Sequence, residues 1–105
     1  LTHNFENIVY NELIYMGYTL QVYNDGAHEI DFVANKGSKK YYIQSALTVS
    51  EKEKRQQEVR SLNRVGDSFK KIVVVKDNII PWHDDNGILY IGIEQFLLDE
   101  TAMDM

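Results

Sequence analysis

The sequence predicts an α/β domain in which helices flank a mixed sheet. An amphipathic helical pattern near the N-terminus precedes three segments of alternating apolar and polar residues that turn signals separate. A polar helix and then a nearly continuous apolar strand follow them. A three-strand meander followed by a crossover helix and a strand requires both antiparallel and parallel pairs. The expected order is therefore αβββαβ, with a short extra strand and a C-terminal helix.

Composition limits the classes of protein that this chain can represent. Its 105 residues with 44% hydrophobic content fit one domain, residues 1–105. No cysteine is present, which excludes a disulfide framework and a thiolate zinc site. Without a long apolar run or a signal peptide, we expect a cytoplasmic protein without a membrane span. The net charge of -5 argues against a stand-alone nucleic-acid binder. Because the chain begins at Leu1 rather than Met, we expect it to be either a processed product or a fragment of a longer protein.

The first helix is expected over residues 4–16. Phe5, Val9 and Met16 lie close to one direction of the helical wheel, and Glu12 lies in the middle of this apolar stripe. A carboxylate in that position needs a metal, a cation or a hydrogen-bond donor, or it must extend to the edge of the helix. Both alternatives remain open for Glu12 on helical geometry alone.

The next three segments, residues 18–23, 28–35 and 39–47, have the pattern of strands. Between the last two, Gly37-Ser38 fits a two-residue hairpin loop. This loop sets a register that places Asp31 opposite Gln44, with their Cβ atoms about 5 Å apart. By simple alternation, both side chains are expected on the face that carries Glu29, Val33, Tyr42 and Ala46.

A polar helix is expected to follow. Ser50 and Glu53 form a capping box that opens it, and it should run to about Val65 with Gly66 as its stop. A narrow apolar stripe should pack against the sheet; it consists of Val59, Leu62 and Val65. The helix also carries arginines that could face a phosphate or form a solvated, charge-mixed face. These are Arg55, Arg60 and Arg64.

The last third of the chain is expected to complete the sheet. Residues 69–76 read as an internal strand, because they are apolar almost without interruption. Residues 77–87 contain the only Pro and the only Trp and are expected to form a loop. A short strand at 88–93 and a helical turn at 94–98 follow, and residues 100–105 are expected to be a frayed end.

Isolated polar residues give weaker signals. His83-Asp84-Asp85 could ligate a metal, although three adjacent polar residues in a loop more often serve only the loop. His3 and His28 have no partner at the spacing of metal ligands.

A resemblance becomes specific once this order is assembled. The αβββαβ order, with a Glu on the first helix, an Asp on the second strand and a polar triplet on the third, is similar to the PD-(D/E)XK, or restriction-endonuclease-like, fold. Several sequence segments also resemble the C-terminal domain of a family of bacterial and archaeal AAA+ ATPases. The function of that domain is largely undefined. The strings that carry this resemblance are FENIVYNEL, EIDFVANK, YYIQSA, DSFKKIVVV and GILYIGIEQFLL. It implies an attached AAA+ ATPase domain in the parent chain. The present sequence has no Gly-rich phosphate loop of its own.

The nuclease resemblance implies a set of site residues. Glu12 matches the helix acid, Asp31 the second-strand acid, and Gln44-Ser45-Ala46 the triplet. In active members the acids hold Mg²⁺ and a Lys at the third triplet position activates the attacking water. Here Gln44 supplies oxygen without charge and Ala46 replaces the Lys, so the implied site is degenerate.

Two functions remain open on these grounds. The favoured one is a non-catalytic recognition or regulatory domain of an AAA+ ATPase, which binds protein or nucleic acid. The alternative is a Mg-dependent nuclease with a remodelled active site built on Glu12, Asp31 and Gln44. That alternative needs a cation to replace the missing Lys, and the candidates on the polar helix are Lys52, Lys54 and Arg55.

Overall fold

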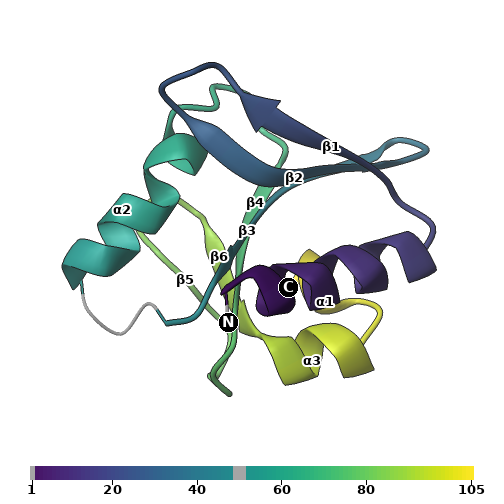
Figure 1. Cartoon of the computed structure of the whole chain (residues 1–105). Coiled ribbons are helices and arrows are strands. Elements are labelled where there is room, and N and C mark those ends of the chain that lie inside the picture. Colours follow the sequence, from purple (N-terminus) through teal and green to yellow (C-terminus); the bar gives the residue numbers. More distant parts are fainter. Residues whose placement is uncertain (1, 49–51) are drawn as a thin grey trace.

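A single mixed sheet forms the centre of the molecule (Figure 1), a computed structural model that describes residues 2–48 and 52–105. The sheet has six strands in the order β1-β2-β3-β4-β6-β5. In chain order the elements are α1 (Thr2–Tyr15), β1 (Thr19–Asn24), β2 (Glu29–Lys36), β3 (Lys39–Ala46), α2 (Lys52–Asn63), β4 (Lys70–Val75), β5 (Trp82–His83), β6 (Leu89–Gly92), α3 (Ile93–Leu98) and a 3-10 turn (Ala102–Asp104). The predicted α/β class is confirmed.

Strand pairing follows the expected mixture of directions. The strands β1, β2 and β3 form an antiparallel meander, and β4 pairs in parallel with both β3 and β6. The segment 77–87 differs from the prediction, because Trp82 and His83 form an edge strand antiparallel to β6. A two-residue strand is too short to show a period of two in the sequence.

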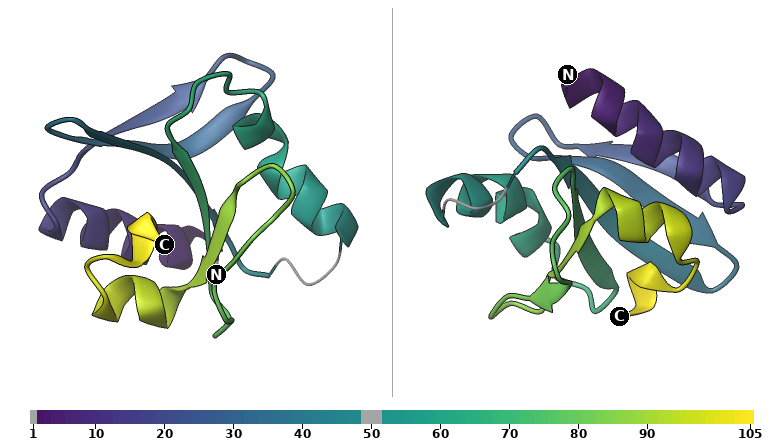
Figure 2. Two further views of the ribbon diagram at one scale, coloured as in Figure 1. Left: turned by 180° about the vertical axis from the view of Figure 1, so that it is seen from behind. Right: turned by 90° about the horizontal axis from the view of Figure 1, so that it is seen from below.

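Two layers of helix cover the sheet (Figures 1 and 2). The helix α2 lies on one face, whereas α1 and α3 lie on the other. Phe5, Val9 and Leu13 of α1 belong to the same buried cluster as Phe96 of α3. Val59 of α2 belongs to a second cluster on the opposite face. The sheet therefore separates two apolar cores, as expected when strands are buried on both sides.

The hairpin between β2 and β3 has the predicted turn. Gly37 has a φ of 60°, a backbone conformation that residues with a Cβ atom rarely adopt. The two-residue loop aligns Phe32 with Ile43 and Ala34 with Tyr41. The predicted register is confirmed from the turn to Phe32 and Ile43, whereas Asp31 and Gln44 lie just beyond the last paired residues.

The strand β2 contains a bulge that the sequence did not reveal. Gln21 of β1 pairs with Val33, but Tyr23 pairs with Ile30, so one residue of β1 lies opposite two residues of β2. Those two are Asp31 and Phe32. Because a bulge breaks strict alternation, Ile30 and Val33 both join the α2-side core although they are three positions apart. Strict alternation would instead place Ile30 on the face of Phe32 and Ala34, which belong to the α1-side core.

The helix α2 ends two residues earlier than predicted, at Asn63 rather than Val65. Ser50 of the predicted capping box lies outside the described residues. None of the described helices is long and apolar enough to cross a membrane.

The C-terminal residues are packed rather than frayed, so that prediction is wrong. Ala102 and Met103 are buried in the core on the side of α1. The hydroxyl of Tyr41 on β3 donates a hydrogen bond to the carboxylate of Asp104. Two apolar residues in a short polar string have no periodicity that could have indicated this packing.

Shortening a buried C-terminal side chain should therefore destabilise the fold. Met103 is 3% exposed, and we expect Met103→Ala to lower the free energy of unfolding by about 2 kcal/mol or more. The control Leu98→Ala removes a side chain that is 78% exposed and should cost less than about 0.5 kcal/mol. Urea denaturation measures both. Equal stability of Met103→Ala and the wild type would contradict the packed C-terminus.

Candidate functional site

The side chain of Gln44 joins β2 to β3 where their backbones stop pairing. The backbone register of the two strands ends at Phe32 and Ile43. Beyond it, Oε1 of Gln44 accepts the N–H of Asp31 at 2.7 Å, and its Nε2 donates to the C=O of Glu29 at 2.9 Å. A primary amide offers the same donor and acceptor as a peptide group. Gln44, which is only 7% exposed, therefore replaces a stretch of strand backbone.

Asp31 makes the reverse connection. Its Oδ2 accepts the backbone N–H of Ser45 at 2.8 Å and the hydroxyl of Ser45 at 2.9 Å. The Gln44 side chain on β3 thus bonds the backbone of β2, and the Asp31 side chain on β2 bonds the backbone of β3. We call this arrangement the Asp31–Gln44 exchange.

The two side chains of the exchange do not share one face. Gln44 lies on the side of α2, where its Nε2 also approaches the C=O of Glu58 at 3.5 Å. Asp31, in the bulge, bonds Ser45. Ser45 pairs with Val74 on β4, which belongs to the α1-side core, so Asp31 lies toward that face. The prediction that Asp31 and Gln44 project to one side is wrong, because alternation fails at the bulge.

A second carboxyl approaches Asp31 from α1, and it belongs to Glu6. Burial, a side-chain hydrogen bond with Asp31 and the negative charges of Asp31 and Glu29 raise the pKa of Glu6 to about 7. Near neutral pH Glu6 therefore holds a proton for much of the time and can donate it to the Asp31 carboxylate.

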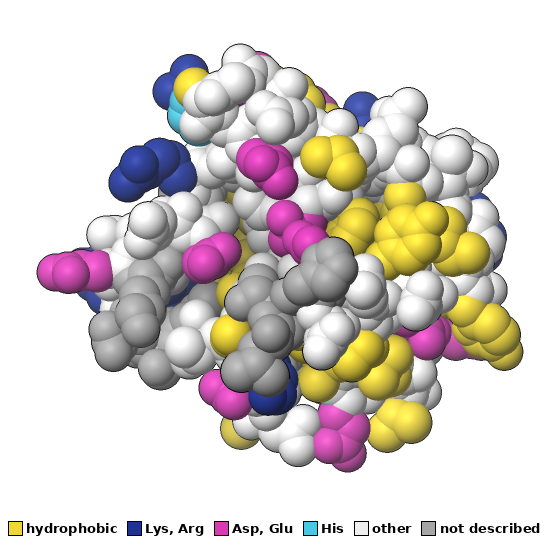
Figure 3. Space-filling view, viewed as in Figure 1, with side chains coloured by type: hydrophobic (Ala, Val, Ile, Leu, Met, Phe, Trp, Pro, Cys, Tyr) yellow, Lys and Arg dark blue, Asp and Glu magenta, His cyan; other side chains and the backbone are white. Residues whose placement is uncertain are grey.

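A third acid reaches the same region from α2. Burial, with the charge of Asp31 as a smaller cause, raises the pKa of the Glu58 carboxyl. Figure 3 shows acidic side chains gathered in the middle of one face, between α1 and α2. Within residues 2–48 and 52–105, no group of three or more His, Asp or Glu side chains is arranged to hold a metal ion.

Glu12 lies apart from this cluster. It is half-buried on α1, six positions after Glu6, which is about 9 Å along a helix axis. Its carboxylate makes no hydrogen bond or ion pair with the described residues. The structure brings Asp31 and Gln44 together, but it is Glu6 that contacts Asp31. The three residues implied by the nuclease resemblance therefore do not fit Mg²⁺ as one ligand set here.

Sequence reasoning missed Glu6 for two reasons. It stands one position after Phe5, at the edge of the apolar stripe, whereas Glu12 stands at its centre. The bulge that turns Asp31 toward α1 has no mark in the sequence. The available signal was the acid itself in the first half of an amphipathic helix.

The position expected to carry a catalytic Lys belongs to the core. Ala46 is buried among apolar residues on the α2 side. Of the candidate replacements, Arg55 lies with its guanidinium 5.3 Å from the ring centre of Trp82, and Lys52 is exposed. The side chain of Lys54 lies outside the described part of the chain.

The His83-Asp84-Asp85 segment serves its loop. Oδ1 of Asp84 accepts the backbone N–H of Asn86 at 2.9 Å and of Ile88 at 3.0 Å, and Oδ2 accepts the hydroxyl of Tyr90 at 2.9 Å. These bonds hold the turn between β5 and β6 and favour the structural interpretation of the segment.

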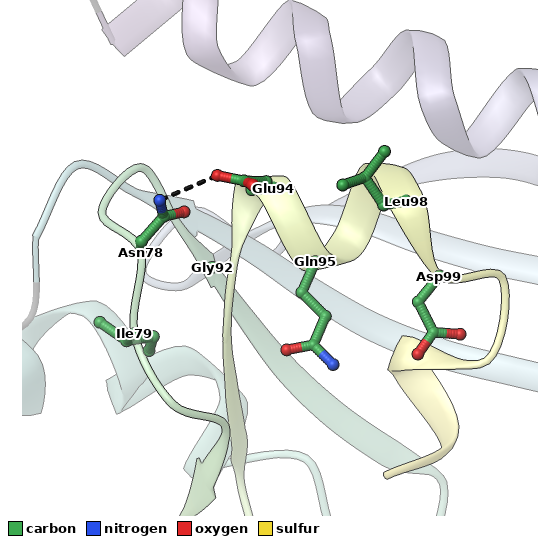
Figure 4. Close-up of a pocket in the computed structure, with 7 residues that line it drawn as sticks. All are labelled: Asn78, Ile79, Gly92, Glu94, Gln95, Leu98 and Asp99. Carbon is green, nitrogen blue, oxygen red and sulfur yellow. Dashed lines mark hydrogen bonds between the residues drawn. The ribbon is translucent and has the colours of Figure 1, made fainter.

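A separate hollow of about 400 Å³ lies between α3 and the loop after β4 (Figure 4). Within it, Nδ2 of Asn78 donates to Oε2 of Glu94 at 2.8 Å. Gly92 is required beside it, because a Cβ there would lie 2.7 Å from the backbone oxygen of Asp77. This hollow therefore marks where the loop is held against α3. Its lining consists of Asn78, Ile79, Gly92, Glu94, Gln95, Leu98 and Asp99.

The fold and site define an α/β domain with a cluster of acids around an acid–amide strand junction. Residues 1–96 match the family described as "Domain of unknown function (DUF4143)", and the chain belongs to this family.

A relative in Haemophilus influenzae is considerably longer than this chain. Its printed name is "Uncharacterized protein", and it is 35% identical over 72 residues. The match covers 69% of this chain but 17% of the relative, so the chain spans only about a sixth of that protein. No solved structure matches the chain.

The Asp31–Gln44 exchange yields a stability prediction. Gln44→Leu keeps a similar volume but leaves the Asp31 N–H and the Glu29 C=O without their partner, and it should cost about 2 to 4 kcal/mol. The control Gln21→Leu changes an exposed amide on β1 and should stay within about 0.5 kcal/mol. Chemical denaturation compares the two. A Gln44→Leu domain as stable as Gln21→Leu would show that the amide does not join the strands.

The raised pKa of Glu6 yields a pH prediction. The folded state holds the Glu6 proton between about pH 4.5 and 7, whereas the unfolded state releases it, so stability contributed by this proton is lost as the pH rises through that window. Glu6→Gln keeps a neutral donor and should flatten the fall in melting temperature between pH 5 and pH 8. The control Glu12→Gln should retain the wild-type profile. Identical profiles for both variants would contradict the Glu6–Asp31 contact.

Proposed function

We propose that this domain is a non-catalytic recognition or regulatory module, with a degenerate PD-(D/E)XK nuclease-like site, attached to a cytoplasmic AAA+ ATPase. The strings FENIVYNEL, EIDFVANK and GILYIGIEQFLL, which resemble the C-terminal domain of such ATPases, support the attachment. The length of the Haemophilus influenzae relative is consistent with a domain that is part of a larger protein.

The Asp31–Gln44 exchange is the observation that carries the non-catalytic assignment. A nuclease of this kind needs oxygen ligands that are free to meet a cation. Here Oε1 of Gln44 accepts a backbone N–H, and Oδ2 of Asp31 accepts two hydrogen bonds from Ser45. The groups at the site are engaged in joining strands, and Ala46 cannot activate water.

A protein partner fits the surface better than a nucleic acid. Figure 3 shows hydrophobic side chains exposed over α1 and α3. Tyr15 is 84% and Leu98 78% exposed, and Ile8 is also exposed. Exposed apolar groups of this kind mark contact surfaces, whereas the net charge of -5 disfavours phosphate contacts. We propose that the attached ATPase or its protein ligand covers these side chains.

The alternative function is a Mg-dependent nuclease with a remodelled site. One observation favours it: the charge of Asp31 contributes to the raised pKa of two acids from other elements, Glu6 and Glu58. In this alternative Glu6 takes the role that the resemblance implies for Glu12. A divalent cation would relieve the repulsion among these carboxylates.

Metal titration and cleavage assays separate the two functions. We expect calorimetry with Mg²⁺ and Mn²⁺ to show no saturable binding that depends on Glu6 or Asp31, and we expect no cleavage of single- or double-stranded DNA. The variants are Glu6→Gln and Asp31→Asn, with Glu94→Gln on α3 as the control. Binding and cleavage that both variants abolish and the control retains would replace our proposal with the nuclease.

A further inference from the structure

A second pocket, of about 330 Å³, lies between the end of α2 and the turn that joins β1 to β2. On the face shown in Figure 3, a histidine and Lys or Arg side chains gather near this end of α2. Polar side chains from three elements and two tyrosine rings line the pocket. The lining residues are Tyr23, Asp25, His28, Tyr42, Ser61, Arg64, Val65 and Gly66.

The acceptor groups of this pocket already have donors. Oδ1 of Asp25 accepts the backbone N–H of Ala27 at 3.1 Å and of His28 at 2.7 Å. Oδ2 of Asp25 accepts the hydroxyl of Tyr23 at 3.3 Å. These hydrogen bonds lower the pKa of Asp25, the bond from His28 most strongly. Asp25 therefore organises the turn and has little capacity left for a ligand.

The donor groups, by contrast, have few acceptors among the described residues. The guanidinium of Arg64 makes no hydrogen bond or ion pair with the described residues. Nδ1 of His28 is buried without a hydrogen-bond partner, 3.6 Å from Oδ1 of Asp25. Ser61 accepts the N–H of Glu29 at 3.2 Å through its Oγ, which leaves its own proton free to donate.

The arrangement of Asp25 and His28 orients the imidazole. With Nδ1 facing the Asp25 carboxylate, Nε2 is the ring nitrogen left for a ligand. Arg64 adds a planar fork of donors that suits carboxylate and phosphate oxygens. The surplus of donors over acceptors selects an anionic group.

We propose that this pocket binds the phosphate or carboxylate group of a small organic anion, with Arg64 and His28 as the binding residues. Ser61 supplies a third donor, and Asp25 acts as a positioning residue for His28. The volume exceeds that of the anionic group alone, and the rings of Tyr23 and Tyr42 offer apolar walls for the remainder of the ligand. This assignment does not depend on the proposed function, because neither Asp31 nor Gln44 lines the pocket.

Nitrogen–proton correlation NMR tests the pocket directly, with inorganic phosphate and acetate as probes in separate titrations at constant ionic strength. We expect saturable shifts of the backbone amides of His28, Ser61 and Gly66. Arg64→Gln should raise the apparent Kd by about tenfold or more, which is the loss expected for a charge-assisted hydrogen bond. His28→Gln should weaken binding in the same direction.

Arg60→Gln is the matched control, because Arg60 stands one turn earlier on α2 and does not line the pocket. It should change the Kd by less than about twofold. The same spectra show whether each variant is folded. Tighter binding of one probe identifies phosphate or carboxylate as the preferred group. An unchanged Kd in Arg64→Gln, an equal loss in Arg60→Gln, or shifts confined to other residues would each overturn the proposal.

Discussion

The hydrogen bonds between Asp31 and Gln44 and the opposite strand are the constraint on which the rest of the site depends. Where β2 and β3 separate, the partly buried backbone groups of Asp31 and Glu29 would lose their hydrogen-bond partners, at a cost in stability for each group. The amide of Gln44 satisfies both groups at 2.7 and 2.9 Å. The strands can therefore diverge without leaving these backbone groups unpaired. Acidic side chains from α1 and α2 approach the junction that this opens.

The bulge in β2 decides which side chains meet there. Without it, Asp31 would lie on the side of α2 beside Gln44, as alternation predicts. With it, Asp31 bonds Ser45 and receives Glu6 from α1. The sequence allowed the class of fold, the hairpin turn and the register to be predicted, because glycine conformation and hydrophobic period are local properties. It did not reveal the bulge or the packed C-terminus, since both depend on contacts between residues far apart in the chain.

The choice of Gln at position 44 has opposite consequences for stability and for metal chemistry. A carboxylate there could still accept the N–H of Asp31, but it could not donate to the C=O of Glu29, and it would add a charge beside Asp31 and Glu58. The neutral amide avoids both costs. The same neutrality removes one charge from a ligand set for Mg²⁺. The residue that suits the strand junction is thus one that would weaken a magnesium site here.

The middle and the C-terminal end of α2 show different chemistry for related physical reasons. Near its middle, Glu58 adds to a group of carboxyls that hold a proton among themselves, and burial makes further negative charge there unfavourable. Near its end, the Asp25 carboxylate already accepts hydrogen bonds from its own turn, so that Arg64 and Nε2 of His28 remain for a ligand. An anion is repelled from the first region and attracted to the second. If this domain responds to a small ligand, electrostatics favours the pocket between α2 and the β1–β2 turn over the acidic cluster around Asp31.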